Sequence, residues 1–155
     1  MRNRFLTLAF LLCLVGTASE AQAQSRFGVQ ASFADDADFG VGARLALAPP
    51  AGSPVRIMAS FDWFFPDAPV DYWELNGNVV YMVPVVNSAV APYVGGGLNV
   101  AHVSVDGGTI GSSDTDMGLN LLGGMEFGGQ LPLYLEARVE ISGGEQFVIT
   151  GGFYF

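Results

Sequence analysis

The chain ends with Gln146-Phe147-Val148-Ile149-Thr150-Gly151-Gly152-Phe153-Tyr154-Phe155, so its last residue is a large apolar ring. Side chains of an extended segment point alternately to opposite faces, and one face of this stretch is apolar: Phe147, Ile149, Phe153 and Phe155. Thr150 and Tyr154 take the other face. Chain ends usually fray into water. An apolar face kept to the last residue therefore predicts a β-strand that is held in place to its end.

The same alternation occurs in seven earlier segments, with turn-forming residues between them. The eight predicted strands cover residues of about 26–33, 39–48, 55–65, 72–83, 91–105, 116–127, 133–141 and 146–155. The seventh segment has the clearest pattern, because Leu133, Leu135, Ala137, Val139 and Ile141 alternate with polar residues. The fifth has the weakest, because Gly95-Gly96-Gly97 interrupts it.

The N-terminus has the three parts of a secretory signal peptide. Two arginines precede an apolar core over residues 5–15 and a small-x-small cleavage site that ends at Ala23. The apolar run is too short for a spanning helix, which needs about 20 residues. We therefore predict a cleavable signal peptide over residues 1–23 and a single mature domain over residues 24–155.

The mature chain is strongly acidic. The whole sequence has 6 basic and 15 acidic residues; removing Arg2, Arg4 and Glu20 with the signal leaves 4 and 14, a net charge of −10. Such a chain does not neutralise phosphates, so we expect no nucleic-acid partner. The only cysteine, Cys13, lies inside the signal, which excludes disulfide or thiol chemistry in the mature domain.

The apolar content is high, yet it is not arranged as a spanning helix. The mean hydropathy is +0.39, but no continuous apolar run long enough to cross a bilayer follows residue 23. Alternating strands that face lipid on one side combine these two properties, and an even number of strands returns both ends to one side. The sequence predicts an all-β fold: an eight-stranded, antiparallel, up-and-down transmembrane β-barrel preceded by a cleavable signal peptide.

The predicted connections alternate in charge along the chain. One set is acidic and covers residues 34–38, 66–71, 106–115 and 142–145, whereas the other set carries no charge and covers residues 49–54, 84–90 and 128–131. If both chain ends are periplasmic, the acidic set forms the extracellular loops. Aromatic residues near residues 66–71 are expected in an outer interfacial girdle: Trp63, Phe64, Phe65, Tyr72 and Trp73. A second girdle is expected from Phe27, Phe153 and Phe155.

The charged residues of the strands share the inward parity. All four mature arginines and six acidic residues form this set: Arg26, Arg44, Arg56, Asp62, Glu74, Asp116, Glu126, Glu136, Arg138 and Glu140. An arginine that faces hydrocarbon at mid-membrane costs about 2–4 kcal/mol. Eight strands enclose room only for side chains. We interpret the set as a luminal charge network that fills the barrel, with no catalytic, cofactor-binding or metal-binding residues among it.

His102 and Ser104 offer an alternative interpretation. Residues two apart on a strand share a face, so a histidine base and a serine nucleophile lie side by side there. This spacing resembles the His/Ser pair of the outer-membrane lipid A deacylases, but the longer polar context around the serine is missing, since Val105-Asp106-Gly107 follows Ser104. The alternative function is an outer-leaflet lipid-modifying enzyme.

Three segments carry a resemblance to a known family: Pro92 to Leu98, Gly118 to Phe127, and Gly152 to Phe155. They resemble the outer-membrane β-barrel family of small OmpA/OmpX-type, porin-like barrels. The resemblance implies the bacterial outer membrane as location and outer-membrane lipids as surroundings. It also implies that the barrel-assembly machinery reads the C-terminal signal at Ile149, Phe153 and Phe155.

The family has no common enzymatic activity or cofactor. We therefore expect a monomeric, non-enzymatic envelope protein with a structural or surface-interaction role. A soluble lipocalin-like carrier, with a polar exterior and an apolar cavity, remains a further alternative. A pore is the least favoured interpretation.

Overall fold

Each alternating segment of the sequence forms a β-strand. The structure, a computed structural model, describes residues 25–67, 69–105, 111–142 and 145–155. The strands are β1 (Arg26–Ala34), β2 (Asp38–Ala46), β3 (Val55–Phe64), β4 (Val70–Met82), β5 (Val90–Val105), β6 (Ser112–Phe127), β7 (Leu133–Glu140) and β8 (Phe147–Tyr154). No helix in these ranges is long and apolar enough to cross a membrane. The signal peptide predicted over residues 1–23 lies outside the described residues.

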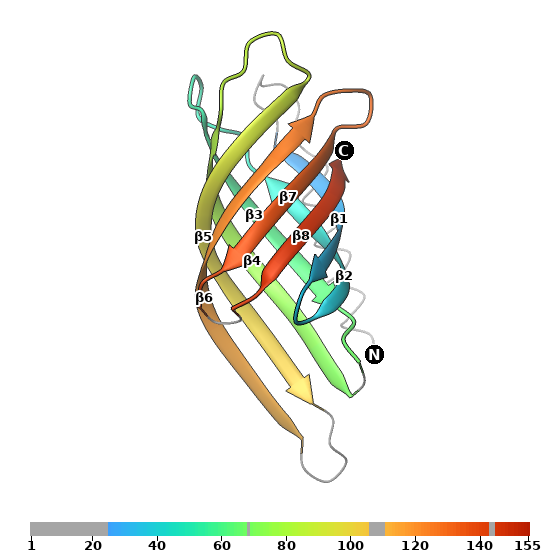
Figure 1. The fold of residues 1–155 in the computed structure, drawn as a ribbon. Coiled ribbons are helices and arrows are strands. Elements are labelled where there is room, and N and C mark those ends of the chain that lie inside the picture. The colour runs from blue at the N-terminus through green and yellow to red at the C-terminus, as the bar shows by residue number, and fades with distance from the viewer. Residues whose placement is uncertain (1–24, 68, 106–110, 143–144) are drawn as a thin grey trace, which may run out of the picture.

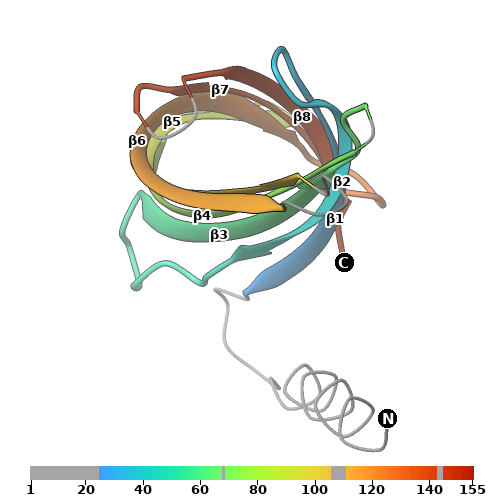
Figure 2. The same cartoon turned by 90° about the horizontal axis from the view of Figure 1, so that it is seen from below.

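The eight strands close into one antiparallel barrel in sequence order (Figure 1). The ring closes where β8 pairs with β1, from Gly28 opposite Tyr154 to Ala34 opposite Val148, and the view along the barrel shows the unbroken wall (Figure 2). The predicted all-β fold, a closed eight-stranded antiparallel barrel, is confirmed. We call the end that holds both Arg26 and Tyr154 the turn end, because the three uncharged connections lie there, and the opposite end the loop end.

One boundary prediction was wrong. The loop predicted over residues 106–115 is shorter, because β6 already begins at Ser112, opposite Val105. Strand β7 pairs with β6 only from Asn120 onward. The first residues of β6 therefore extend past the wall of the barrel, and the β5–β6 hairpin projects beyond the other strands at the loop end (Figure 1).

The two faces of the barrel differ in polarity. On β7, Leu135 is 46% exposed, whereas the next residue, Glu136, is 2% exposed. Large apolar side chains cover the outside on every strand, and glutamates, arginines and asparagines lie inside. The soluble carrier interpretation required the opposite arrangement, with a polar exterior and an apolar cavity, and this structure contradicts it.

Glycines make room for aromatic rings inside the barrel. On neighbouring strands, inward glycines lie directly opposite inward rings: Gly28 and Tyr154, Gly40 and Phe64, Gly124 and Tyr93, Gly152 and Tyr134. A Cβ atom added to Gly124 would lie 2.5 Å from the Tyr93 hydroxyl and 2.7 Å from the Leu135 carbonyl oxygen. A narrow barrel can therefore hold a large ring only where its neighbour has no side chain.

We predict that Gly124→Ala destabilises the barrel by about 1–3 kcal/mol, the usual effect of overpacking a core. Gly123→Ala is the matched control, because Gly123 precedes it on β6 and a Cβ there has no neighbour closer than 3.8 Å. Urea unfolding of the protein in lipid vesicles measures both effects. Equal losses of stability for Gly124→Ala and Gly123→Ala would contradict the close packing of the Tyr93 ring against Gly124.

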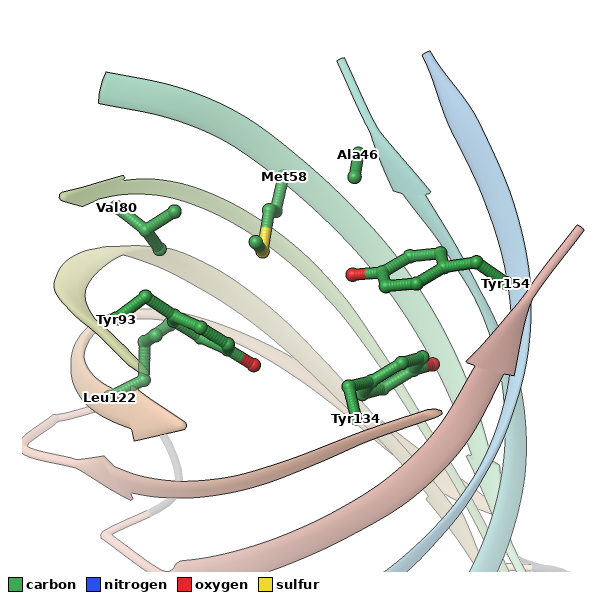
Figure 3. Close-up of a cluster of buried hydrophobic side chains, with 7 residues drawn as sticks. All are labelled: Ala46, Met58, Val80, Tyr93, Leu122, Tyr134 and Tyr154. Carbon is green, nitrogen blue, oxygen red and sulfur yellow. The ribbon is translucent and has the colours of Figure 1, made fainter. Parts of the chain in front are cut away.

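Two clusters of buried, mostly apolar residues lie inside the barrel, one toward each end. The turn-end cluster consists of Ala46, Met58, Val80, Tyr93, Leu122, Tyr134 and Tyr154, and Figure 3 shows the hydroxyls of Tyr93 and Tyr154 directed into the barrel. The loop-end cluster consists of Ala34, Ala37, Phe64, Tyr72, Ala101 and Val148. The polar and charged side chains lie mainly between these two clusters.

The position of two aromatic residues differs from the sequence prediction. Phe64 and Tyr72 are buried in the loop-end cluster, with ring centroids 5.4 Å apart, and do not belong to the interfacial girdle. Their neighbours Trp63, Phe65 and Trp73 do face outward. The reason is strand parity, since adjacent residues on a strand cannot share a face.

Candidate functional site

The luminal charge network is the candidate functional site. The structure places nine of the ten predicted side chains on the inside of the barrel, in three ion-paired groups and one isolated carboxylate. Asp116 is the exception. It is exposed on the part of β6 that has no β7 partner, and among the described residues it has no ion-pair partner.

The first group lies at the turn end. Arg26 Nη2 is 2.5 Å from Glu126 Oε2, and Arg56 Nη1 is 2.9 Å from Glu126 Oε1. The Arg26 guanidinium also lies over the ring of Tyr154, 4.3 Å from its centroid. These side chains are partly exposed, so water screens the ion pairs and their net contribution to stability is small.

The second group is buried in the middle of the barrel. Arg44 donates to both oxygens of Glu136, at 2.6 and 2.9 Å, and the Tyr93 hydroxyl donates to Glu136 at 2.8 Å. The Arg44 guanidinium lies 4.4 Å from the centroid of the Tyr134 ring. The two parallel hydrogen bonds to the carboxylate and the contact with an aromatic ring together stabilise the buried guanidinium.

The third group, toward the loop end, has more acid than base. Arg138 donates to Glu74 at 2.7 Å and to Glu140 at 3.0 Å, and all three side chains are fully buried. One guanidinium therefore serves two carboxylates. Neutral donors supply the remaining hydrogen bonds, since Gln146 Nε2 donates to both carboxylates and Asn99 donates to Glu140 at 3.1 Å.

Asp62 is buried without an arginine partner among the described residues. Gln30 Nε2 donates to its two oxygens at 2.7 and 2.9 Å, and the Ser32 hydroxyl donates at 2.8 Å. The Tyr134 hydroxyl in turn donates to Gln30 Oε1 at 2.9 Å. In the part of the chain that the structure describes, hydrogen bonds from neutral groups, and not an ion pair, stabilise this carboxylate.

The neutral members of the network were not predicted from the sequence. The residues concerned are Gln30, Ser32, Tyr72, Tyr93, Asn99 and Gln146. Their inward parity was the available signal, because a buried charge needs polar neighbours on all sides. Some buried polar atoms, including Arg44 Nε and Arg138 Nη1, have no protein hydrogen-bond partner within the described residues. In polar cavities, ordered water molecules supply the hydrogen bonds that such atoms lack.

His102 does not pair with Ser104. Its ring lies against Trp73 on the outer face, with centroids 5.1 Å apart, and its Nδ1 is hydrogen-bonded to Thr115 Oγ1 at 2.7 Å. Within the described ranges no hydrogen bond links His102 to Ser104. The same ranges contain no cluster of three or more histidine, cysteine or acidic side chains that could hold a metal ion.

The C-terminal residues form an aromatic group at the turn end. Phe155 is 71% exposed; its ring is stacked on Phe27 at 6.1 Å and meets Phe153 edge-on at 5.3 Å. The Phe155 backbone N–H donates to the Phe27 carbonyl oxygen at 2.8 Å. Ile149 also faces outward on β8. Backbone hydrogen bonds to β1 thus continue to the C-terminal residue.

No protein-family model matches the sequence, and no curated protein matches it. Solved structures do. The N-terminal β-barrel domain of OprF from Pseudomonas aeruginosa is similar, with a TM-score of 0.64 and 15% identity, over 86% of this chain and 100% of that chain. Neisserial surface protein A (NspA) has a TM-score of 0.57 and 16% identity, over 84% and 91%.

Ail, the attachment invasion locus protein of Yersinia pestis, has a TM-score of 0.55 and 13% identity, over 87% of this chain and 100% of that chain. All three are eight-stranded outer-membrane β-barrels. At these identities the likeness concerns the fold alone.

Proposed function

We propose that this chain, which has the fold of the eight-stranded outer-membrane β-barrels, is a non-enzymatic integral protein of the bacterial outer membrane with a structural or surface-interaction role. The polarity of the barrel carries this proposal, because apolar side chains cover the outside while ionised ones are enclosed. Only a lipid surrounding makes that arrangement favourable. The protein acts as a monomer, with the loop end facing the exterior.

The side chains that cross the lumen support a role other than transport. The buried ion pairs of Arg44 and Arg138 cross the interior, and an apolar cluster lies on either side of them. Such networks pair most of the buried charges and help to fix strand register. Planar-bilayer recordings are therefore expected to give no stable conductance.

Fractionation and gel electrophoresis test the proposal. The protein should appear in the outer-membrane fraction and require detergent for extraction. It should also migrate faster on a gel without heating than after boiling, since a closed barrel resists detergent until heated. A soluble periplasmic product without this heat-dependent shift would contradict the proposal.

The non-enzymatic assignment has its own test. Cells that express the protein are expected to show unchanged lipid A acylation, and neither His102→Ala nor Ser104→Ala should alter it. The geometry favours this outcome, because His102 is engaged by Thr115. Deacylated lipid A that disappears with either variant would establish the enzymatic alternative.

We predict that deletion of Phe155 lowers the amount of folded barrel in the membrane several-fold, since Ile149, Phe153 and Phe155 form the proposed assembly signal. Ile141→Ala is the control, because it removes an exposed apolar side chain elsewhere. The heat-dependent gel shift of membrane fractions measures the folded amount. Equal amounts of folded barrel for the wild type and the deletion variant would show that Phe155 is not part of the assembly signal.

A further inference from the structure

The mouth of the barrel at the loop end contains a pocket of about 280 Å³. Four apolar side chains line it: Ala37, Pro66, Val70 and Val103. Its polar lining consists of Asp36 at the rim and of Tyr72 and Gln146 at the level of the loop-end cluster. Pockets of this kind, mainly apolar with a few polar groups, hold small ligands.

The charge of the barrel is distributed unevenly along its axis. The half from Arg44 and Glu136 to the turn end holds three arginines and two glutamates within the described residues. The other half holds one arginine, Arg138, and eleven acidic residues: Asp35, Asp36, Asp38, Asp62, Asp67, Asp71, Glu74, Asp114, Asp116, Glu140 and Glu145. The half toward the turn end thus has a formal charge of +1, and the half toward the loop end has a formal charge of −10. Acidic walls of low dielectric focus the field at the mouth and attract cations.

Gln146 supplies an unused acceptor at the pocket. Its side chain is 3% exposed, and its Nε2 donates to Glu74, Glu140 and Tyr72. Its amide oxygen accepts no hydrogen bond from any residue in the described part of the chain. Gln146 lines the pocket, so this unused acceptor belongs to a residue that a ligand bound there would contact.

Aromatic and acidic groups at the same place favour a positive charge. Tyr72 lines the pocket, and the face of a tyrosine ring attracts an ammonium group. Asp36 adds a carboxylate at the rim, and the Glu74 and Glu140 carboxylates lie directly behind Tyr72 and Gln146. The negative potential of these carboxylates would repel an anionic ligand.

We propose that this pocket binds an organic cation, a primary ammonium group carried on a small apolar body. The ammonium lies between Asp36, the Tyr72 ring and Gln146 Oε1, and the apolar body contacts Val70 and Val103. The proposal deepens the surface-interaction role proposed above and rests on it for the exposure of the loop end to the exterior.

An NMR titration of the detergent-folded protein with 2-phenylethylammonium tests the proposal, followed at the Val103 methyl and Gln146 side-chain amide signals. Saturable shifts are expected, with 2-phenylethanol binding about tenfold more weakly because it lacks the charge. Val103→Phe fills the pocket and should abolish the shifts at Gln146. Val100→Phe, the same change on the opposite face of β5, should leave them intact.

Two charge variants separate local from general attraction. Asp36→Asn should weaken ammonium binding about fivefold, whereas Asp114→Asn, which removes an equal charge outside the pocket, should change it less than twofold. Equal affinity for the alcohol, equal effects of the two asparagine variants, or unchanged binding by Val103→Phe would overturn the proposal. Heat-dependent migration of every sample shows that the barrel is folded, so a failure of binding leaves the proposed function standing.

Discussion

Replacement of Arg138 by methionine is expected to destabilise the barrel by about 3–5 kcal/mol, the effect of leaving a buried charge without its partner. Arg138 is the only arginine that contacts Glu74 and Glu140 among the described residues, and all three side chains are fully buried. Its loss leaves two carboxylates in a low-dielectric lumen with neutral donors alone. Urea unfolding in lipid vesicles, followed by tryptophan fluorescence, measures the free energy.

Two further variants make this prediction specific. Arg26→Gln is the matched control, because Arg26 is 25% exposed and Arg56 also contacts Glu126; its loss should be below about 1 kcal/mol. The triple variant Arg138→Met, Glu74→Gln, Glu140→Gln should regain much of the lost stability, since it removes all three charges together. Similar losses for Arg138→Met and Arg26→Gln would contradict the role assigned to the buried group.

Leu121→Arg is expected to cost about 2–4 kcal/mol, the value for an arginine that faces the middle of the bilayer from a barrel wall. Leu121 is 58% exposed on β6, between Gly96 of β5 and Val139 of β7. Its side chain points away from the lumen, so no carboxylate is within reach to pair with the new charge. The same unfolding measurement applies.

Ser113→Arg is the control for this change. Ser113 has the same outward parity on the same strand, but it lies on the part of β6 that projects beyond the barrel wall. The arginine there meets water, so the change in stability should be within about 0.5 kcal/mol, as for ordinary surface substitutions. Equal effects at the two positions would mean that the wall around Leu121 does not face hydrocarbon.

The number of strands, their order and the face of most residues could be predicted from the sequence, because all three follow from alternation with a period of two. The seventh segment is the clearest example, where Leu135 and Glu136 take the opposite faces that the pattern indicates. The assignment of Phe64 and Tyr72 to the interfacial girdle was wrong, although alternation indicated their correct face. Their parity pointed inward, but their position beside the outward Trp63 and Trp73 favoured the girdle.

The contacts across the lumen could not be predicted. Arg44 and Glu136 lie on strands β2 and β7, and whether they meet depends on the stagger of all the strands around the ring. Asp116 shows the same limit, since its inward parity is of no consequence where β7 has already ended. The neutral partners of Asp62 were missed because parity indicates which face a residue takes and not which residues it contacts.

Quenching by brominated lipids tests the orientation of the wall most directly. In a background with Trp63→Phe and Trp73→Phe, a single tryptophan is placed on β3 at Phe61, which is 39% exposed, or at Phe64, which is 1% exposed. We predict that the bromine atoms of the lipid chains strongly quench Phe61→Trp and leave Phe64→Trp nearly unchanged. Strong quenching at Phe64→Trp with none at Phe61→Trp, or equal quenching at both, would contradict a barrel whose apolar face meets lipid.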